Sequence, residues 1–193
     1  MWATFEGTHP RLDGLAAWAP TYRHQAWCAA LQAAGCTDNL EAQARVLEER
    51  YIAGQRAGHP PLPGAVDLVR RQSAAVPVAI VTNGPPDIQR LKIEQCGVAP
   101  LLCAVVISGE LGVGKPDPSI FGAALGQLGV QAQRAVMVGD NWDRDVGGAL
   151  AVGMEAVWIS HGRERPEPHA SSGDASAEAK VAVARGPADV ALV

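Results

Sequence analysis

Hydrophobic and polar residues follow two different patterns along this chain, and one pattern replaces the other near residue 60. In residues 15–35 and 38–55, apolar side chains recur at the three-to-four-residue spacing of an amphipathic helix. The first stretch ends at Gly35, and the second begins at Asp38 or Asn39, which are residue types that often cap helices. The pattern therefore predicts two helices before residue 60.

The segment GHPPLPG (residues 58–64) interrupts the pattern, and a new one follows it. Short apolar runs now alternate with helical stretches, and the runs are apolar on both faces. Such an alternation is typical of a parallel sheet covered by helices on both sides. The predicted strands are 76–84, 101–109, 134–140 and 154–160, and the predicted helices are 65–72, 85–97, 117–129 and 144–153.

Composition narrows the class of protein. The chain has 193 residues and is 48% hydrophobic, which is enough for one ordinary domain with a real core. The net charge is −4 and no basic run is present, so nucleic acid and anionic membranes are not expected as partners. No apolar stretch reaches the roughly 20 residues that span a bilayer, and the N-terminus does not resemble a signal peptide. A soluble, cytoplasmic protein is expected.

The four cysteines, Cys28, Cys36, Cys96 and Cys103, show no CxxC spacing. Zinc binding and a disulfide framework are therefore both disfavoured. Buried, reduced thiols are the expected state of these residues.

Polar residues follow three of the predicted strands at the point where each strand ends. The first strand ends in VTNG, where the Thr82 hydroxyl and the amides of Asn83 and Gly84 precede a helix. A helix N-terminus of this kind suits an anion. The same residue types also serve as ordinary helix caps, so this segment alone leaves both interpretations open.

The second strand is followed by GVGKPDP (residues 112–118), in which Lys115 stands between Gly114 and Pro116. A lysine on such a constrained loop can neutralise a phosphate or hold a carboxylate in place. A solvated loop lysine is the alternative interpretation.

The third strand runs into VMVGDNWDRDVGGA (residues 136–149), which places Asp140, Asp143 and Asp145 within six residues. Clustered carboxylates at a strand end provide the hard oxygen ligands that Mg²⁺ prefers. Helix capping by Asp140 or Asp143 is the alternative. Ligands of open α/β sheets lie at the carboxyl ends of the strands, so the hydroxyl, the lysine and the acids together indicate phosphoryl transfer.

The segments VTNG, GVGKPDPSIF, GDNWDRDVGGA and GMEAVW together resemble motifs two to four of the haloacid dehalogenase (HAD) superfamily, over about residues 60–160. They are most similar to its phosphatase branches with a helical cap, the phosphoglycolate phosphatase-like and nucleotidase-like members. The resemblance implies an α/β fold with a Rossmann-like parallel sheet and helices on both faces. Residues 1–60 would be a partial helical cap and 61–161 the core, and the polar residues 162–193 are expected to form a mobile tail with a short final strand in VALV.

The resemblance also implies roles for individual residues. Thr82 and the amides of Asn83 and Gly84 would bind the phosphoryl group, and Lys115 would be a catalytic residue that bridges the nucleophile and the phosphate.

The same resemblance implies a separate role for each of the three clustered acids. Asp140 would coordinate Mg²⁺, and Asp145 would support the metal through water or through Lys115. Asp143 lies between the two motif positions and is expected to be a surface or capping acid. The substrate would be a small phosphorylated metabolite.

One part of the family pattern is absent. Members begin their reaction on an Asp in a DxDxT or DxDxS pattern at the end of the first, central strand. That Asp forms an aspartyl-phosphate, and the second Asp protonates the leaving group. No DxDxT or DxDxS pattern occurs in this chain, and the acids before the first helix, Glu6 and Asp13, follow no apolar strand. The sheet is therefore expected to lack its central strand.

Two functions of different classes follow. The first is a Mg²⁺-dependent phosphatase whose nucleophile segment is absent through N-terminal truncation or a misplaced start, so that the 193 residues alone are inactive. The second is a non-catalytic relative that keeps a phosphate-binding or interaction site. A 2-haloacid dehalogenase is less favoured, because displacement of a halide from carbon needs no Mg²⁺. Oligomeric state and substrate identity cannot be inferred.

The predicted cap carries several residues that could line a substrate entrance, namely Trp18, Tyr22, Arg23, His24 and Trp27. The alternative, which we favour from sequence, is that the aromatic residues form the interior of the cap and the polar residues are solvated.

Overall fold

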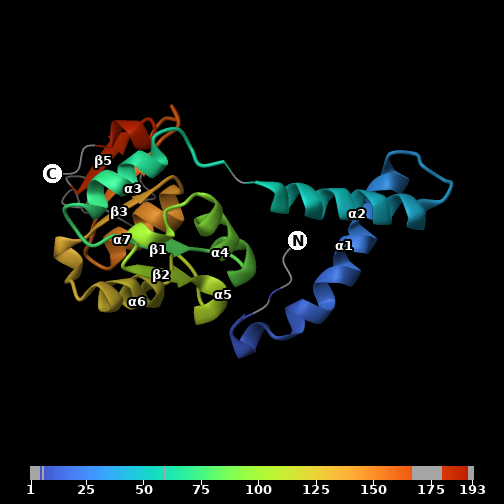
Figure 1. The fold of residues 1–193 in the computed structure, drawn as a ribbon, viewed down its shortest axis with the longest axis horizontal. Coiled ribbons are helices and arrows are strands. Elements are labelled where there is room, and N and C mark those ends of the chain that lie inside the picture. The colour runs from blue at the N-terminus through green and yellow to red at the C-terminus, as the bar shows by residue number, and fades with distance from the viewer. Residues whose placement is uncertain (1–4, 6, 59, 167–179, 191–193) are drawn as a thin grey trace.

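The computed structural model describes residues 5, 7–58, 60–166 and 180–190. Within them, two long N-terminal helices form a hairpin, and the later elements form an α/β body (Figure 1). The hairpin ends at Ala57, and the first helix of the body begins at Ala65. A proline-rich segment connects the two, as expected for residues that disfavour both helix and strand.

Helices α1 (Gly14–Ala33) and α2 (Leu40–Ala57) of the hairpin are joined by contacts across their interface. The Trp27 ring meets Tyr51 edge-on, with 5.9 Å between the ring centroids. Arg23 Nε donates to Glu48 Oε1 at 2.9 Å, and the Arg23 side chain is only 11% exposed. Both an aromatic contact and a largely buried ion pair therefore connect the two helices.

The expected division between an aromatic interior and a solvated polar face holds for Trp27 but is wrong for Trp18, Tyr22 and Arg23. Trp18 and Tyr22 are 47% and 42% exposed and stack on each other with centroids 4.7 Å apart. Arg23, which was expected to be solvated, lies in the interface instead. The reason is geometric: two helices bury only the narrow stripe between them, and residues four apart share a face, so Trp18 and Tyr22 lie together away from that stripe.

The N-terminal segment also contacts the α/β body. The backbone N–H of His9 donates to the carbonyl of Gly109 at 2.6 Å. Phe5 packs with Ala19 of α1 and with Ile88 of helix α4 (Pro86–Gln95) in a small apolar cluster, in which all three residues are buried. These contacts attach the base of the hairpin to the body.

The strands of the body are short and parallel. Strand β1 (Ala79–Thr82) pairs with β2 (Ala104–Ile107), and Thr82 lies opposite Ile107. Strand β3 (Val136–Gly139) pairs with β4 (Glu155–Ile159), which also pairs with β5 (Val181–Ala184). Each predicted strand of residues 76–160 is therefore present, in a shorter form.

Helices cover both faces of the larger sheet, and β4 shows why. Its residues alternate between the faces, as the period of a strand requires. Ala156 and Trp158 pack into a core built with α6 (Pro118–Leu128) and α7 (Gly148–Ala151). Val157 and Ile159 pack on the other face with Leu68 of α3 (Ala65–Ser73). The predicted α/β fold, with parallel strands and helices on both sides, is confirmed.

The helices of the body begin and end close to the predicted positions. Helix α6 shows the local cause at both ends: Asp117 accepts hydrogen bonds from the backbone and the hydroxyl of Ser119, and Gly129 ends the helix with φ of 66°. The Ser119 donors hold the pKa of Asp117 below its ordinary value. The helices are α3 (Ala65–Ser73), α4 (Pro86–Gln95), α5 (Ser108–Leu111), α6 (Pro118–Leu128) and α7 (Gly148–Ala151), with 3-10 helices at Pro10–Leu12, Ala99–Leu101, Ala132–Arg134 and Pro187–Asp189 and a π-helix at Trp142–Gly147.

The five described strands form two sheets rather than one, with the order β1-β2 in the first and β3-β4-β5 in the second. All four residues of β1 are only half-buried, and Val136 of β3 is 40% exposed. By contrast, β4 has four buried residues in a row. Strands β1 and β3 each pair on one side only, which is the arrangement expected of a sheet without its central strand.

The C-terminal region differs from its expected form. Residues 162–193 are polar overall, yet Val181–Ala184 form strand β5, which extends the sheet beside β4. Val190 is buried in the core cluster with Leu68, outside any strand. The remaining residues of the predicted VALV strand lie outside the described part of the chain. Here the local signal, a short V-A-V-A run in a polar context, was too weak to predict pairing with β4.

Among the described residues, none of the helices combines the length and the apolar character needed to cross a membrane. Cys28 and Cys36 are half-buried and Cys103 is exposed, so the expected full burial of these thiols is wrong.

Candidate functional site

The three polar strand ends come together through side-chain contacts. Thr82 is the last residue of β1, Asp140 directly follows β3, and Lys115 lies on the loop between α5 and α6. Two sets of contacts connect these loops, one between Asn83 and Lys115 and one between Lys115 and Asp145. The site is therefore assembled around Lys115.

Asn83 holds the backbone of Lys115 at two points. Its Nδ2 donates to the Lys115 carbonyl at 2.9 Å, and its Oδ1 accepts from the Lys115 N–H at 2.8 Å. The Asn83 side chain thus satisfies both backbone groups of one loop residue, as a neighbouring strand would. Sequence reasoning assigned Asn83 an amide role only, and its side-chain role was missed.

Lys115 Nζ lies 2.6 Å from Asp145 Oδ1, and the two side chains are only 11% and 7% exposed. The second oxygen, Oδ2, accepts the backbone N–H of Asn141 at 3.0 Å. Because a buried charge needs a partner, this ion pair fixes the position of the ammonium group. Asp145 is therefore engaged at both of its oxygens.

Glycines make room for these contacts. A Cβ on Gly139 would lie 2.4 Å from Asp145 Oδ2, and one on Gly114 would lie 2.8 Å from Asn83 Oδ1. Real Cβ atoms do not approach so closely, so any side chain at Gly139 would displace the carboxylate. The close fit explains the residue type at both positions.

Asp145 reaches this position from a π-helix, Trp142–Gly147. The carbonyl of Asn141 accepts from both Asp145 N and Val146 N, and the Asn141 side chain caps Arg144 N at 2.8 Å. π-helical turns occur frequently at functional sites, where they redirect side chains. The sequence predicted an ordinary helix here, because a π turn has no distinct hydrophobic period.

The amide of Gly84, an expected phosphate donor, has a partner in this structure. It donates to Ser108 Oγ at 2.9 Å, while the Gly84 carbonyl accepts from Gly109 N at 3.2 Å. Thr82 is half-buried at the end of β1. Ser108 was missed by the sequence analysis, although a polar residue directly after β2 is a signal that would have found it.

Asp140 has a different environment from Asp145. Its side chain is 64% exposed, and its nearest basic partner is His161, with 4.0 Å between Nε2 and Oδ2. Its backbone carbonyl, by contrast, is held by Trp158 Nε1 and Arg163 Nη2 at 3.1 and 2.9 Å. The backbone is fixed while the carboxylate remains available. Asp143 is exposed, as a surface acid would be.

The described residues of this region supply some of the ligands that a hard divalent cation needs. Carboxylate oxygens are the ligands that Mg²⁺ prefers, and Asp140 offers one that makes no short hydrogen bond to the described residues. Asp145, with both oxygens occupied, suits an indirect role through Lys115 or water. The described residues of this region hold no third clustered acid, so further ligands would have to come from water, substrate or another segment.

The chain was compared with known proteins. A family model described as haloacid dehalogenase-like hydrolase matches residues 14–153. The chain is 40% identical over 172 residues to the phosphoserine phosphatase of Thermus thermophilus, covering 89% of this chain and 67% of the relative. It is 37% identical over 139 residues to the phosphoglycolate phosphatase of Rhodospirillum rubrum, covering 70% of this chain and 57% of that protein.

Among solved structures, the putative HAD-hydrolase YfnB of Bacillus subtilis, bound to magnesium, superposes with a TM-score of 0.58 at 21% identity. The match covers 77% of this chain and 72% of that one, and at this identity it shows the fold alone. The chain spans between about half and two thirds of the length of the two curated relatives. The matched family model and the 40% identity settle the resemblance first seen in the motifs: the chain belongs to the haloacid dehalogenase-like hydrolase family.

Proposed function

We propose that this protein is a Mg²⁺-dependent phosphatase that acts on a small phosphorylated metabolite through an aspartyl-phosphate. The observation that carries the proposal is the buried Lys115–Asp145 pair, held in place by Asn83. A fixed ammonium group at a strand end stabilises the charge that develops on a transferring phosphoryl group. The curated relatives described above, two phosphatases of small phosphorylated acids, support the substrate class.

Each residue of the proposed site has a separate role in binding or in catalysis. Thr82 and the amides of Asn83 and Gly84 bind the phosphoryl oxygens, and Lys115 bridges the phosphoryl group and the nucleophile. For Gly84 this requires its N–H to leave Ser108 Oγ when phosphate binds. Asp140 holds Mg²⁺, which offsets the phosphate charge when bound. Asp145 positions Lys115.

The nucleophile is assigned to a strand outside these 193 residues, placed between β1 and β3. Its Asp attacks phosphorus, the leaving alkoxide takes a proton from a second acid, and water then hydrolyses the aspartyl-phosphate to release phosphate. Three observations support this: no DxDxT or DxDxS pattern occurs in the sequence, the described strands form two sheets, and β1 and β3 pair on one side only. The residues 1–193 alone are then inactive.

A non-catalytic, phosphate-binding role is the second candidate. It is favoured by the same missing pattern and by the Gly84 amide, which is already satisfied by Ser108. Both candidates require a phosphate site around Lys115, so binding and turnover have to be measured separately.

The binding site is tested on the 193-residue chain by titrating inorganic phosphate and Mg²⁺ while following backbone amide signals by NMR. We expect shifts at residues 82–84, loss of phosphate binding in Lys115→Ala, and at least tenfold weaker Mg²⁺ binding in Asp140→Asn. Asp143→Asn is the matched control, because Asp143 is an exposed acid in the same loop. Unchanged phosphate binding in a folded Lys115→Ala protein would contradict the site.

The catalytic role is tested with the coding sequence upstream of Met1. We expect an in-frame strand that ends in DxDxT or DxDxS, and expect the longer protein to hydrolyse phosphoserine or phosphoglycolate when Mg²⁺ is supplied. Replacing the first Asp of that pattern by Asn should abolish turnover. A stop codon directly upstream, together with phosphate binding by the 193-residue chain, would favour the non-catalytic role.

A further inference from the structure

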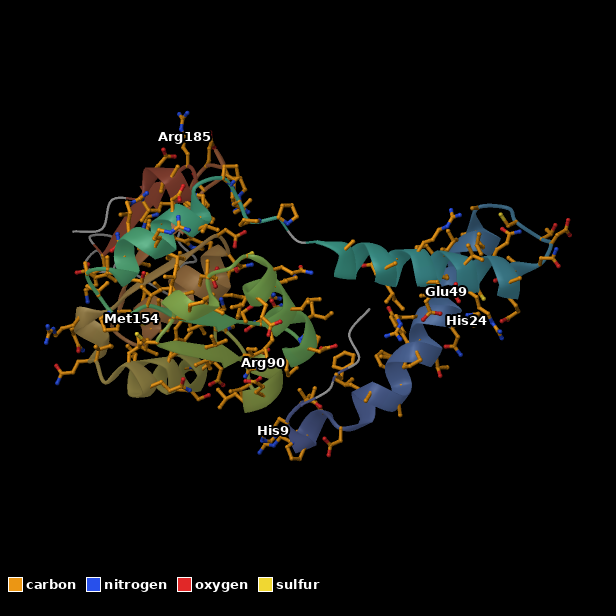
Figure 2. All side chains as sticks on the ribbon, viewed as in Figure 1. His9, His24, Glu49, Arg90, Met154 and Arg185 are labelled. Atoms are coloured by element: carbon orange, nitrogen blue, oxygen red, sulfur yellow. The ribbon has the colours of Figure 1, made fainter. Side chains whose placement is uncertain are left out.

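A group of potential metal ligands lies in the hairpin, away from the site around Lys115. His24 and Cys28 are four residues apart on α1 and therefore share a face, and Glu41 is in the first turn of α2. One ligand atom from each of these three residues lies within 4.8 Å of the others. Figure 2 shows His24 on the hairpin, far from Met154 in the body.

We propose that His24, Cys28 and Glu41 form a zinc site that joins the two helices of the hairpin. The Cys28 Sγ atom lies 3.7 Å from His24 Nε2 and 4.0 Å from Glu41 Oε1, and Glu41 Oε2 contacts His24 Nε2. With Zn–S and Zn–N bonds of about 2.3 and 2.0 Å, ligands at tetrahedral angles lie about 3.5 Å apart. The two distances from Sγ are thus close to the spacing that the ion requires, whereas the direct contact between Glu41 Oε2 and His24 Nε2 would be replaced by bonds to the ion.

A second carboxylate lies near the other nitrogen of the His24 ring. Glu48 Oε2 lies 3.8 Å from Nδ1 of His24, on the side of the ring opposite Nε2. Glu48 is itself held by Arg23 at 2.9 Å and is only 16% exposed. A carboxylate that accepts a hydrogen bond from the second nitrogen of a metal-bound histidine fixes the ring and its tautomer, and Glu48 would take this role when the ion is bound. The other nitrogen, Nε2, contacts Glu41 and faces the Cys28 thiol.

The ligand types select the metal. A thiolate and an imidazole favour Zn²⁺ and similar borderline ions over Mg²⁺, which prefers oxygen ligands. The Glu41 side chain is 75% exposed, so the ion can enter from solvent and keep a water molecule as its fourth ligand. The site is thus distinct in location and in chemistry from the proposed Mg²⁺ site at Asp140.

Zinc at this position would link α1 to α2. Because the ligands come from both helices, the ion binds the folded hairpin and favours it over the unfolded one. The cysteine spacing in the sequence disfavoured zinc, since the site uses one cysteine and depends on a contact between residues 13 and 17 positions apart.

The test uses the 193-residue chain at mildly alkaline pH, because zinc has to displace the proton of the Cys28 thiol. Co²⁺ serves as a spectroscopic probe and Zn²⁺ as its competitor. We expect one Co²⁺ per chain with a thiolate-to-cobalt charge-transfer band, displacement of Co²⁺ by one equivalent of Zn²⁺, and no displacement by excess Mg²⁺. Absence of the band in the folded protein would overturn the proposal.

Single substitutions test which side chains bind the metal. Cys28→Ser should remove the charge-transfer band and weaken Zn²⁺ binding at least tenfold, whereas Cys36→Ser, in the same hairpin but outside the group, should leave both unchanged. Glu48→Gln should keep the band and weaken binding by about tenfold or more. Asp140→Asn should have no effect, which separates this site from the proposed phosphatase site. A band that survives Cys28→Ser would assign the metal to another thiol and contradict the proposal.

Discussion

At the scale of single residues, the charges of Lys115 and Asp145 depend on each other more than those of any other pair at the site. Both side chains are almost fully buried, and each is the charged partner of the other. Removing one member of such a pair leaves an uncompensated charge, which costs more than the intact pair contributes. The pair therefore matters for folding as well as for the proposed chemistry.

We expect Asp145→Asn to lower the free energy of unfolding by about 3 kcal/mol, since it keeps the shape of the side chain but leaves the Lys115 ammonium without its counter-charge. Urea denaturation followed by circular dichroism measures the change. The matched control is Asp143→Asn, an exposed position two residues earlier, where we expect a change below about 0.5 kcal/mol. Equal effects of the two substitutions would show that the buried pair does not form in solution.

At the scale of elements, the contact between α7 and α6 depends on the absence of a side chain. A Cβ on Gly148 would lie 2.6 Å from the Phe121 ring, and Phe121 is only 1% exposed, so the ring has little room to move. The neighbouring Gly147 has no such restriction, because outside the adjacent backbone of its own helix the nearest heavy atom, the Trp142 carbonyl oxygen, would be 3.6 Å away. Adjacent glycines thus have different roles.

Gly148→Ala is expected to destabilise the protein by about 1–3 kcal/mol through overpacking against Phe121. Gly147→Ala should be neutral or stabilising by up to about 1 kcal/mol, because alanine is the better helix former. Thermal or urea unfolding of the two variants provides the comparison. A Gly148→Ala protein as stable as Gly147→Ala would mean that α7 does not pack on Phe121 as described.

At the scale of the whole molecule, the described strands form two separate sheets, and β1 and β3 each pair with one strand only. Strand β4 pairs on both sides, whereas β1 and β3 pair on one. In a parallel strand, alternate amides point to opposite neighbours, so half of the β1 and β3 amides have no strand partner in the described structure. This difference is open to measurement.

Hydrogen exchange should therefore be slow along β4 and fast at alternate amides of β1 and β3 in the 193-residue chain. In a longer protein that supplies the proposed central strand, exchange at those same amides should slow by at least tenfold, while β4 changes little. Uniformly slow exchange in β1 and β3 of the 193-residue chain would contradict the open arrangement.

The local sequence was sufficient to predict most of the elements and to select the residues of the proposed site. Strands and helices of residues 65–160 follow directly from apolar runs, glycines and prolines, since these act within a few residues of themselves. For the same reason Thr82, Lys115 and Asp140 stood out as polar residues after apolar strands. The expected family and α/β class are confirmed by the comparisons and the fold.

The tertiary structure decided which side chains meet. Three contacts join residues that are more than 20 positions apart. They are the hydrogen bonds between Asn83 and Lys115, the ion pair between Lys115 and Asp145, and the hydrogen bond from Gly84 to Ser108. The same holds for β5, whose pairing with β4 is non-local, and for Cys28, which meets Glu41 only when α1 and α2 fold back on each other. Sequence patterns report local propensity and burial, but long-range contacts depend on how the elements pack, and in this protein both proposed sites are built from such contacts.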